Sequence, residues 1–138
     1  MKSIITLVLI FISSLTYADS EFLEMMVQGK YLLVGKAVDS DDTYHGKIEI
    51  SSNDNELVVS RSINNKTIYG KAEIEPALGG DTKVLRIRFT QDKVNYEQTC
   101  MVSSDLDNYA RISCYLYEPN VRTKQPGLEV LFNDHTAK

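Results

Sequence analysis

TYHGKIEI, residues 43–50, alternates between two kinds of side chain, and that alternation decides the fold class. Successive side chains of an extended strand point to opposite faces. The mainly apolar face of this segment carries Tyr44, Gly46, Ile48 and Ile50. The polar face carries His45, Lys47 and Glu49. The pattern therefore predicts a β-strand with one face in a core and the other in water.

The same period of two recurs along almost the whole chain and predicts eight strands. Turn-forming residues separate the strands, and the pairs Asn64-Asn65 and Gln91-Asp92 suit two-residue hairpin loops. No stretch has the length and the 3.6-residue period of a core helix. The predicted strands cover residues 30–38, 43–51, 55–63, 66–75, 83–90, 93–103, 109–118 and 127–133.

Hairpin register tests this assignment, because facing residues of an antiparallel pair must share a face. Loops at residues 64–65, 53–54 and 91–92 all keep inward positions opposite inward positions. A slip of one residue would place the apolar side chains of a strand on its solvent face. The predicted facing pairs are Leu57 with Ala72, Ile50 with Leu57, Ile48 with Val59, Phe89 with Val94, and Ile87 with Tyr96.

Eight hairpin-linked strands with one apolar face can close into a barrel or split into a sandwich. The meander order, without a long crossover, favours the barrel. Closure would pair the last strand, residues 127–133, with the first, residues 30–38, and both are apolar enough to need a partner. We therefore expect an all-β, eight-stranded antiparallel up-and-down barrel that forms a single domain.

Cys100 and Cys114, the two cysteines of the chain, fall on the inward faces of neighbouring strands and directly opposite each other. Directly opposed residues of an antiparallel pair come close enough to form a disulfide. A redox pair would require a Cys-x-x-Cys motif at a helix N-terminus, which the sequence lacks. We therefore predict a structural disulfide, worth about 3 kcal/mol in the chain-entropy model.

Residues 1–18 have the pattern of a signal peptide, with Lys2, the apolar run Ile4–Ile12 and a cleavage site after Ala18. About nine apolar residues are too few to span a bilayer as a helix. We expect a periplasmic or secreted protein, residues 19–138, without a membrane anchor after cleavage. Without Lys2, 14 basic residues face 19 acidic ones, which argues against binding to nucleic acid or anionic membranes.

Short motifs of the chain resemble the calycin superfamily of lipocalins and avidins. GKY, Gly29–Tyr31, stands where lipocalins carry Gly-x-Trp, and EFLEMM, residues 21–26, is similar to the short helical turn before it. YHGKIEI and YGKAEI, residues 44–50 and 69–74, resemble segments of small exported bacterial lipocalin-like proteins. The resemblance implies a barrel that binds a small molecule or a protein. Tyr31 replaces the lipocalin tryptophan, and the chain has no tryptophan for an avidin-type biotin pocket.

Arg61 is the strongest candidate for a functional residue, because the alternation of inward and outward side chains places its charge inside the barrel. The expected registers put it in one row with Gly46 and Gly35, which would leave room in the lumen near one rim. In that position it suits the carboxylate or phosphate head of a ligand. The alternative is that it extends to solvent over Tyr44, or makes a cation–π contact with that ring.

Further inward polar side chains are candidates for the same ligand-binding site. Tyr44, Tyr96, Gln98 and Tyr31 would then provide polar groups in an otherwise apolar cavity. Alternatively, they satisfy one another's hydrogen bonds in a filled core. An eight-stranded barrel is wide enough for either arrangement.

The outward face around residues 109–118 offers a rival binding surface. Tyrosine, arginine and methionine are enriched at protein interfaces, although aromatic residues are also common on ordinary strand surfaces. The candidate interface residues are Arg86, Met101, Arg111, Tyr115 and Tyr117.

Catalytic motifs are missing: neither histidine points inward, and no hydrolase, metalloprotease or phosphate-loop motif occurs. The acidic loops DSDD, residues 39–42, and DLDN, residues 105–108, lack EF-hand spacing, so we expect polar turns, no metal and no cofactor. We expect a non-catalytic exported protein that binds a small apolar or anionic ligand in its lumen. The alternative is a protein-binding module or inhibitor that uses the outer Tyr/Arg face.

Overall fold

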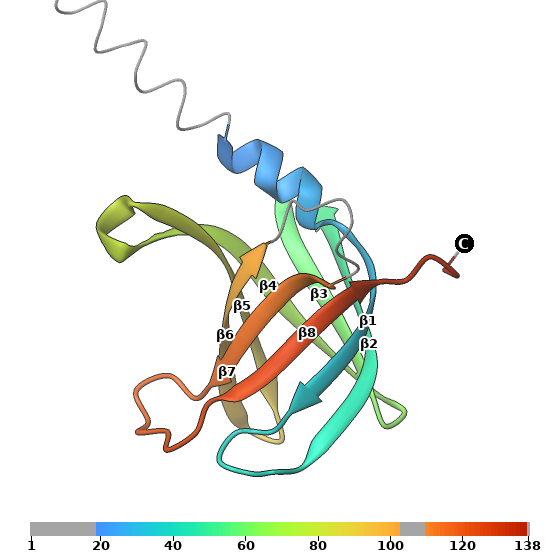
Figure 1. The fold of residues 1–138 in the computed structure, drawn as a ribbon. Helices are drawn as coiled ribbons and strands as arrows, with labels where there is room; N and C mark the ends of the chain where they lie inside the picture. Colours follow the sequence, from blue (N-terminus) through green and yellow to red (C-terminus); the bar gives the residue numbers. More distant parts are fainter. Residues whose placement is uncertain (1–18, 103–109, 138) are drawn as a thin grey trace, which may run out of the picture.

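Within residues 19–102 and 110–137, which the computed structural model describes, eight antiparallel strands close into a barrel in chain order (Figure 1). Each strand pairs with the next, and the last closes the ring against the first. The predicted up-and-down barrel is therefore confirmed. The strands are β1 Gly29–Lys36, β2 Thr43–Asn53, β3 Glu56–Ile63, β4 Lys66–Ala77, β5 Thr82–Gln91, β6 Val94–Val102, β7 Ala110–Tyr117 and β8 Gly127–Asn133.

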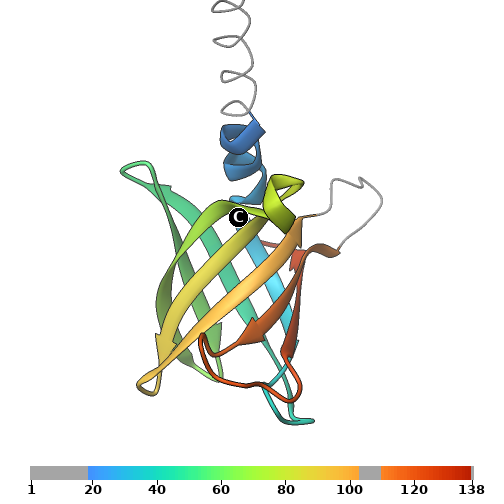
Figure 2. The same ribbon diagram turned by 90° about the vertical axis from the view of Figure 1, so that its left-hand side faces the viewer.

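The two ends of the barrel differ (Figure 2). At the helix end, residues 19–27 are helical, as expected before the first strand, and the 3-10 turn η1, Leu78–Gly80, lies nearby. Val27 is buried there, and its carbonyl accepts a hydrogen bond from the Tyr31 hydroxyl (2.8 Å). None of the described helices combines the length and the apolar character that a bilayer crossing requires. The opposite end, which we call the loop end, carries the connections at residues 37–42, 64–65, 92–93 and 118–126.

Two of the predicted two-residue hairpins, those at residues 53–54 and 91–92, have a register that is wrong by two residues. Ile50 pairs with Val59 rather than with Leu57, and Phe89 pairs with Tyr96 rather than with Val94. The turns lie one residue later than expected, because the pairs Asp54-Asn55 and Asp92-Lys93 adopt the positive φ angles that tight hairpins require. A shift of two keeps every side chain on its expected face. The register around residues 64–65 is confirmed, with Leu57 opposite Ala72.

Alternate side chains of all eight described strands form one core. The predicted disulfide is confirmed: Cys100 and Cys114 face each other in β6 and β7, and both are buried. Buried charged and polar side chains are few among the described residues, and three of them, Arg61, Gln98 and Glu129, meet inside the barrel. These three mark the candidate site.

Candidate functional site

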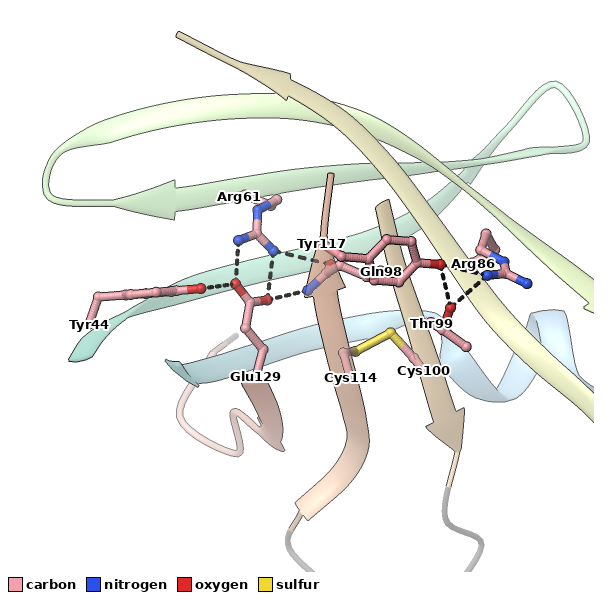
Figure 3. Close-up of a disulfide and its surroundings, with 9 residues drawn as sticks. All are labelled: Tyr44, Arg61, Arg86, Gln98, Thr99, Cys100, Cys114, Tyr117 and Glu129. Carbon is pink, nitrogen blue, oxygen red and sulfur yellow. Dashed lines mark hydrogen bonds and ion pairs between the residues drawn. A yellow bond between two sulfur atoms is a disulfide. The ribbon is translucent and has the colours of Figure 1, made fainter. Parts of the chain in front are cut away.

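Arg61 of β3 and Glu129 of β8 form an ion pair in the lumen (Figure 3). Arg61 is 2 % exposed and Glu129 is 1 % exposed, so neither charge reaches water. Nη1 of Arg61 donates to Oε2 of Glu129 at 2.9 Å, and Nη2 donates to Oε1 at 2.6 Å. This two-point contact is the geometry in which arginine recognises a carboxylate most strongly.

Two neutral side chains form further hydrogen bonds with the pair (Figure 3). Tyr44 donates its hydroxyl proton to Oε1 of Glu129 (2.5 Å), and Gln98 donates from Nε2 to Oε2 (2.5 Å). Nη1 of Arg61 also donates to Oε1 of Gln98 (3.3 Å). The remaining donor, Nε of Arg61, has no partner among the described residues. A buried ion pair is tolerated only when its other lone pairs and protons are largely satisfied in this way.

Gly35 allows Tyr44 to reach Glu129. Gly35 of β1 stands directly between these residues, opposite Tyr44 on one side and opposite Glu129 on the other. A Cβ atom at position 35 would lie 2.6 Å from the Tyr44 ring. The tyrosine therefore crosses the intervening strand over a residue that must lack a side chain.

The charges of the pair hold each other in the ionised state. Burial alone would raise the pKa of Glu129, but the hydrogen bonds and charge of Arg61, with help from Tyr44 and Gln98, lower it below its ordinary value. Burial likewise opposes the charge of Arg61, and Glu129 raises the pKa of that guanidinium above its ordinary value. Burial and the neighbouring Glu129 charge raise the pKa of Tyr44 well above the usual value for tyrosine, so its hydroxyl remains a donor.

Several expectations for Arg61 are wrong. Arg61 stands opposite Ile48 and Ile68, not in a row with Gly46 and Gly35. The β2–β3 register is shifted by two residues, and so is the β1–β2 register, in which Gly46 faces Leu33 rather than Gly35. It does not extend to solvent, because Glu129 holds it inside. Its cation–π contact is with Phe89, whose ring centroid lies 4.2 Å from the guanidinium carbon, and not with Tyr44.

Glu129 is a site residue that the sequence reading missed. It lies on the inward face of β8 between Gly127 and Leu131, so alternation alone would have identified it. Its partner Arg61 is three strands away around the ring, and only closure of the barrel brings the two together.

A cup of about 320 Å³ opens at the loop end, above the ion pair. Arg61 and Tyr44 lie at its floor, and the aromatic stack of Phe89 and Tyr96, with ring centroids 5.5 Å apart, forms part of its wall. The structure thus brings three of the predicted ligand-binding residues to one cavity. The residues that line this cup are Ala37, Val38, Asp39, Tyr44, Arg61, Ile63, Asn64, Phe89, Gln91, Tyr96, Leu116 and Glu118.

The other two predicted ligand-binding residues do not line the cup. Gln98 lies beneath it, fully buried and bonded to Arg61 and Glu129. Tyr31 lies at the helix end, where it bonds Val27. Thus some of the inward polar groups satisfy one another in a filled core, and others face a cavity.

The predicted outer interface divides into two parts. Arg86 and Tyr117 belong to a network within the barrel wall, where Nη1 of Arg86 donates to the Tyr117 hydroxyl (2.8 Å) and to Oγ1 of Thr99 (2.6 Å) (Figure 3). Met101 and Tyr115 are 58 % and 57 % exposed. The side chain of Arg111 lies outside the described residues, as do the predicted signal peptide and the DLDN loop.

Exposed apolar side chains continue from Met101 and Tyr115 onto β8 and β1. Leu128 stands opposite Tyr115, and Leu32 and Val34 follow on the outward side of β1. Each is between 42 % and 52 % exposed. We call the five side chains together the outer apolar face: Leu32, Val34, Met101, Tyr115 and Leu128.

Comparison of the chain with protein-family models, with curated proteins and with solved structures finds no match. Within the described residues, no three histidine, cysteine, aspartate or glutamate side chains gather where they could hold a metal ion. The site thus combines a cup of aromatic, aliphatic and polar side chains with an internally neutralised ion pair beneath it.

Proposed function

We propose that this protein binds a small amphipathic molecule in the cup at the loop end, without catalysing its conversion. The observation that carries the proposal is the cup itself, a concave cavity whose lining combines aromatic and aliphatic side chains with polar and charged ones. Its volume of about 320 Å³ lies at the lower end of the size range of small-ligand sites, and its polar groups would orient a bound molecule. The ligand is therefore small, or it inserts only one end.

The ion pair supports this role by closing the cup from below. Arg61, Glu129 and Gln98 occupy the middle of the lumen, so the ligand stays near the loop end. A floor held by several charge-assisted hydrogen bonds resists rearrangement, and preformed sites bind with a smaller entropic cost. The wider proposal is an exported, calycin-like barrel in the periplasm or outside the cell, with residues 1–18 removed on export.

Binding of the neutral fluorophore N-phenyl-1-naphthylamine tests the proposal, because its emission increases in apolar surroundings. Ile63 and Ile74 provide a matched pair of variants, since both are partly buried, both pack against the core, and they lie at opposite ends of the barrel. Ile63→Trp should fill the cup and weaken probe binding at least tenfold, roughly the effect of losing one well-packed group. Ile74→Trp should leave binding unchanged. A wild-type protein that does not bind, or two variants with equal effects, would contradict the proposal.

Association through the outer apolar face is the second candidate function. The occupant that we propose is a second copy of this chain, because the area suffices for a pair. A large side chain has a surface area of roughly 150–250 Å². Five such side chains, each about half exposed, therefore present on the order of 500 Å² of surface on each copy. Two copies would bury on the order of 1,000 Å², which is the lower limit for a specific interface.

The oligomeric state tests this second candidate. Analytical ultracentrifugation should detect a monomer–dimer equilibrium that Val34→Lys abolishes, because a buried lysine would interrupt the apolar contact. Tyr69→Lys is the matched control, since Tyr69 is exposed on β4, away from these strands. A wild-type monomer at millimolar concentration, or a dimer that survives Val34→Lys, would rule the interface out.

A further inference from the structure

Most of the charged side chains that line the cup are acidic. Arg61, Asp39 and Glu118 are its charged lining residues, and no lysine of the described residues lines it. Arg61 is fully engaged as a charge, because both of its terminal nitrogens bond to Glu129. The carboxylates of Asp39 and Glu118 are therefore left as the unmatched charges of the cup.

Asp39 is fixed at the rim by hydrogen bonds of its side chain and its backbone to the 118–126 connection. Its Oδ1 atom accepts hydrogen bonds from the backbone amides of Lys124 and Gln125, each at 2.8 Å. The Asp39 backbone amide in turn donates to the Gln125 carbonyl (3.0 Å). These contacts join the two longest loops of the loop end, so the carboxylate keeps its place beside the cavity.

Glu118 is half-buried beside Tyr96, and it forms no ion pair with any described residue. Burial and the nearby charge of Glu118 raise the pKa of the Tyr96 hydroxyl, which agrees with a carboxylate close to that ring. Two basic residues at the loop end are occupied elsewhere, since Lys36 pairs with Asp41 and Lys66 pairs with Asp92. Lys93, Arg122 and Lys124 also belong to loop-end connections, but they do not line the cup.

The aromatic wall leaves one ring available to a ligand. Phe89 has the Arg61 guanidinium over its face and stacks with Tyr96 at 5.5 Å. Tyr96 therefore forms the outer layer of the stack, next to Glu118. An aromatic face beside a carboxylate is a suitable environment for an ammonium group.

We propose that the cup selects a cationic amphipath, an alkyl- or arylammonium whose apolar part enters the cavity and whose charge lies between Tyr96, Glu118 and Asp39. This inference rests on the proposed function and gives the class of its ligand. An external anion, which Arg61 alone would favour, is disfavoured here because Glu129 already supplies the anion that Arg61 binds.

Displacement of bound N-phenyl-1-naphthylamine by three hexyl compounds tests the selectivity. The apolar chain is the same in hexyltrimethylammonium, hexanol and hexanesulfonate, so only the head group differs. Hexyltrimethylammonium should displace the probe at a concentration about tenfold lower than hexanesulfonate, with hexanol between them. The difference should shrink at high salt, because the rim charges are partly exposed.

Variants assign the selectivity to the rim. Glu118→Gln and Asp39→Asn should each reduce the preference for the ammonium several-fold while the hexanol affinity stays the same. Asp42→Asn is the matched control, because Asp42 lies in the same loop as Asp39 but does not line the cup. Circular dichroism confirms that each variant is folded.

The two hypotheses fail in different ways. If the wild-type protein does not bind the neutral fluorophore, the proposed function itself is wrong. If the fluorophore binds and hexanesulfonate displaces it at the same concentration as hexyltrimethylammonium, binding in the cup is supported and the cationic class of the ligand is wrong. An equal effect of Asp42→Asn and Glu118→Gln would also overturn the assignment to the rim.

Discussion

Arg61 and Glu129 are joined by two charge-assisted hydrogen bonds in the middle of the barrel, although β3 and β8 are three strands apart. The pair therefore links opposite parts of the wall as well as forming the floor of the cup. Removing one member would leave the other charged and buried, which is more costly than removing both.

Replacement of Glu129 by glutamine should destabilise the protein by about 3–5 kcal/mol, because Arg61 would remain buried without its counter-ion. Urea denaturation at neutral pH measures the change in the free energy of unfolding. The double variant Arg61→Met/Glu129→Leu serves as the control, since it replaces the pair by apolar side chains and should recover most of that loss. A double variant that is less stable than Glu129→Gln would contradict the ion-pair explanation.

Stability should fall in acid partly through Glu129. Its pKa is lower in the folded protein than its ordinary value of 4.5, so its contribution is complete above that value and is lost as the pH falls through the folded pKa. Urea midpoints measured between neutral pH and about pH 3 should therefore drop more in the wild-type protein than in Glu129→Gln. Glu75 and Glu97, whose pKa values are also lowered, are present in both proteins and cancel in the comparison. Parallel pH profiles would show that Glu129 does not contribute.

Gly35→Ala should destabilise the barrel through Tyr44, because the new Cβ atom would lie 2.6 Å from its ring. We expect a loss of about 1–3 kcal/mol, the usual cost of overpacking. The same substitution in a Tyr44→Ala background should cost much less, since the ring would no longer be there. A double-mutant cycle by urea denaturation measures this coupling, and additive effects would contradict the proposed contact.

Removal of the disulfide by Cys100→Ala/Cys114→Ala should lower the free energy of unfolding by about 2–4 kcal/mol, because the reduced chain gains conformational freedom when unfolded. Probe binding should not change, since neither cysteine lines the cup. Thermal unfolding and fluorophore titration measure the two effects separately. Weakened probe binding in a folded variant would indicate that the bridge also shapes the cup.

Side-chain alternation was sufficient to predict the strands, their order and the facing cysteines. Each of these features depends only on contacts within a strand or between two strands that follow each other in the chain. The exact registers depended on which two residues form each turn, and Asp54-Asn55 was preferred over the pair one residue earlier. The partner of Arg61 depended on closure of the ring, which joins β8 to β1. Hairpin reasoning considers adjacent strands, so it identified a charged inward residue without identifying its counter-ion.

The cup also required the three-dimensional structure. Tyr44, Arg61 and Tyr96 were recognisable as inward residues, but Asp39 and Glu118 lie in or beside loops, where alternation carries no information. These two carboxylates are the basis of the proposed preference for a cation, which is the reverse of what Arg61 alone suggests. Loop residues that determine specificity can be found only when the strands that position them are in place.

The most direct test of ligand binding at the loop end is a titration of ¹⁵N-labelled protein with N-phenyl-1-naphthylamine, followed by amide chemical shifts. We expect saturable shift changes at Val38, Asn64, Gln91 and Glu118, and unchanged amides at Val27, Leu57 and Ile74 of the helix end. Saturable changes at the helix end, or no saturable change at all, would contradict the cup as the binding site.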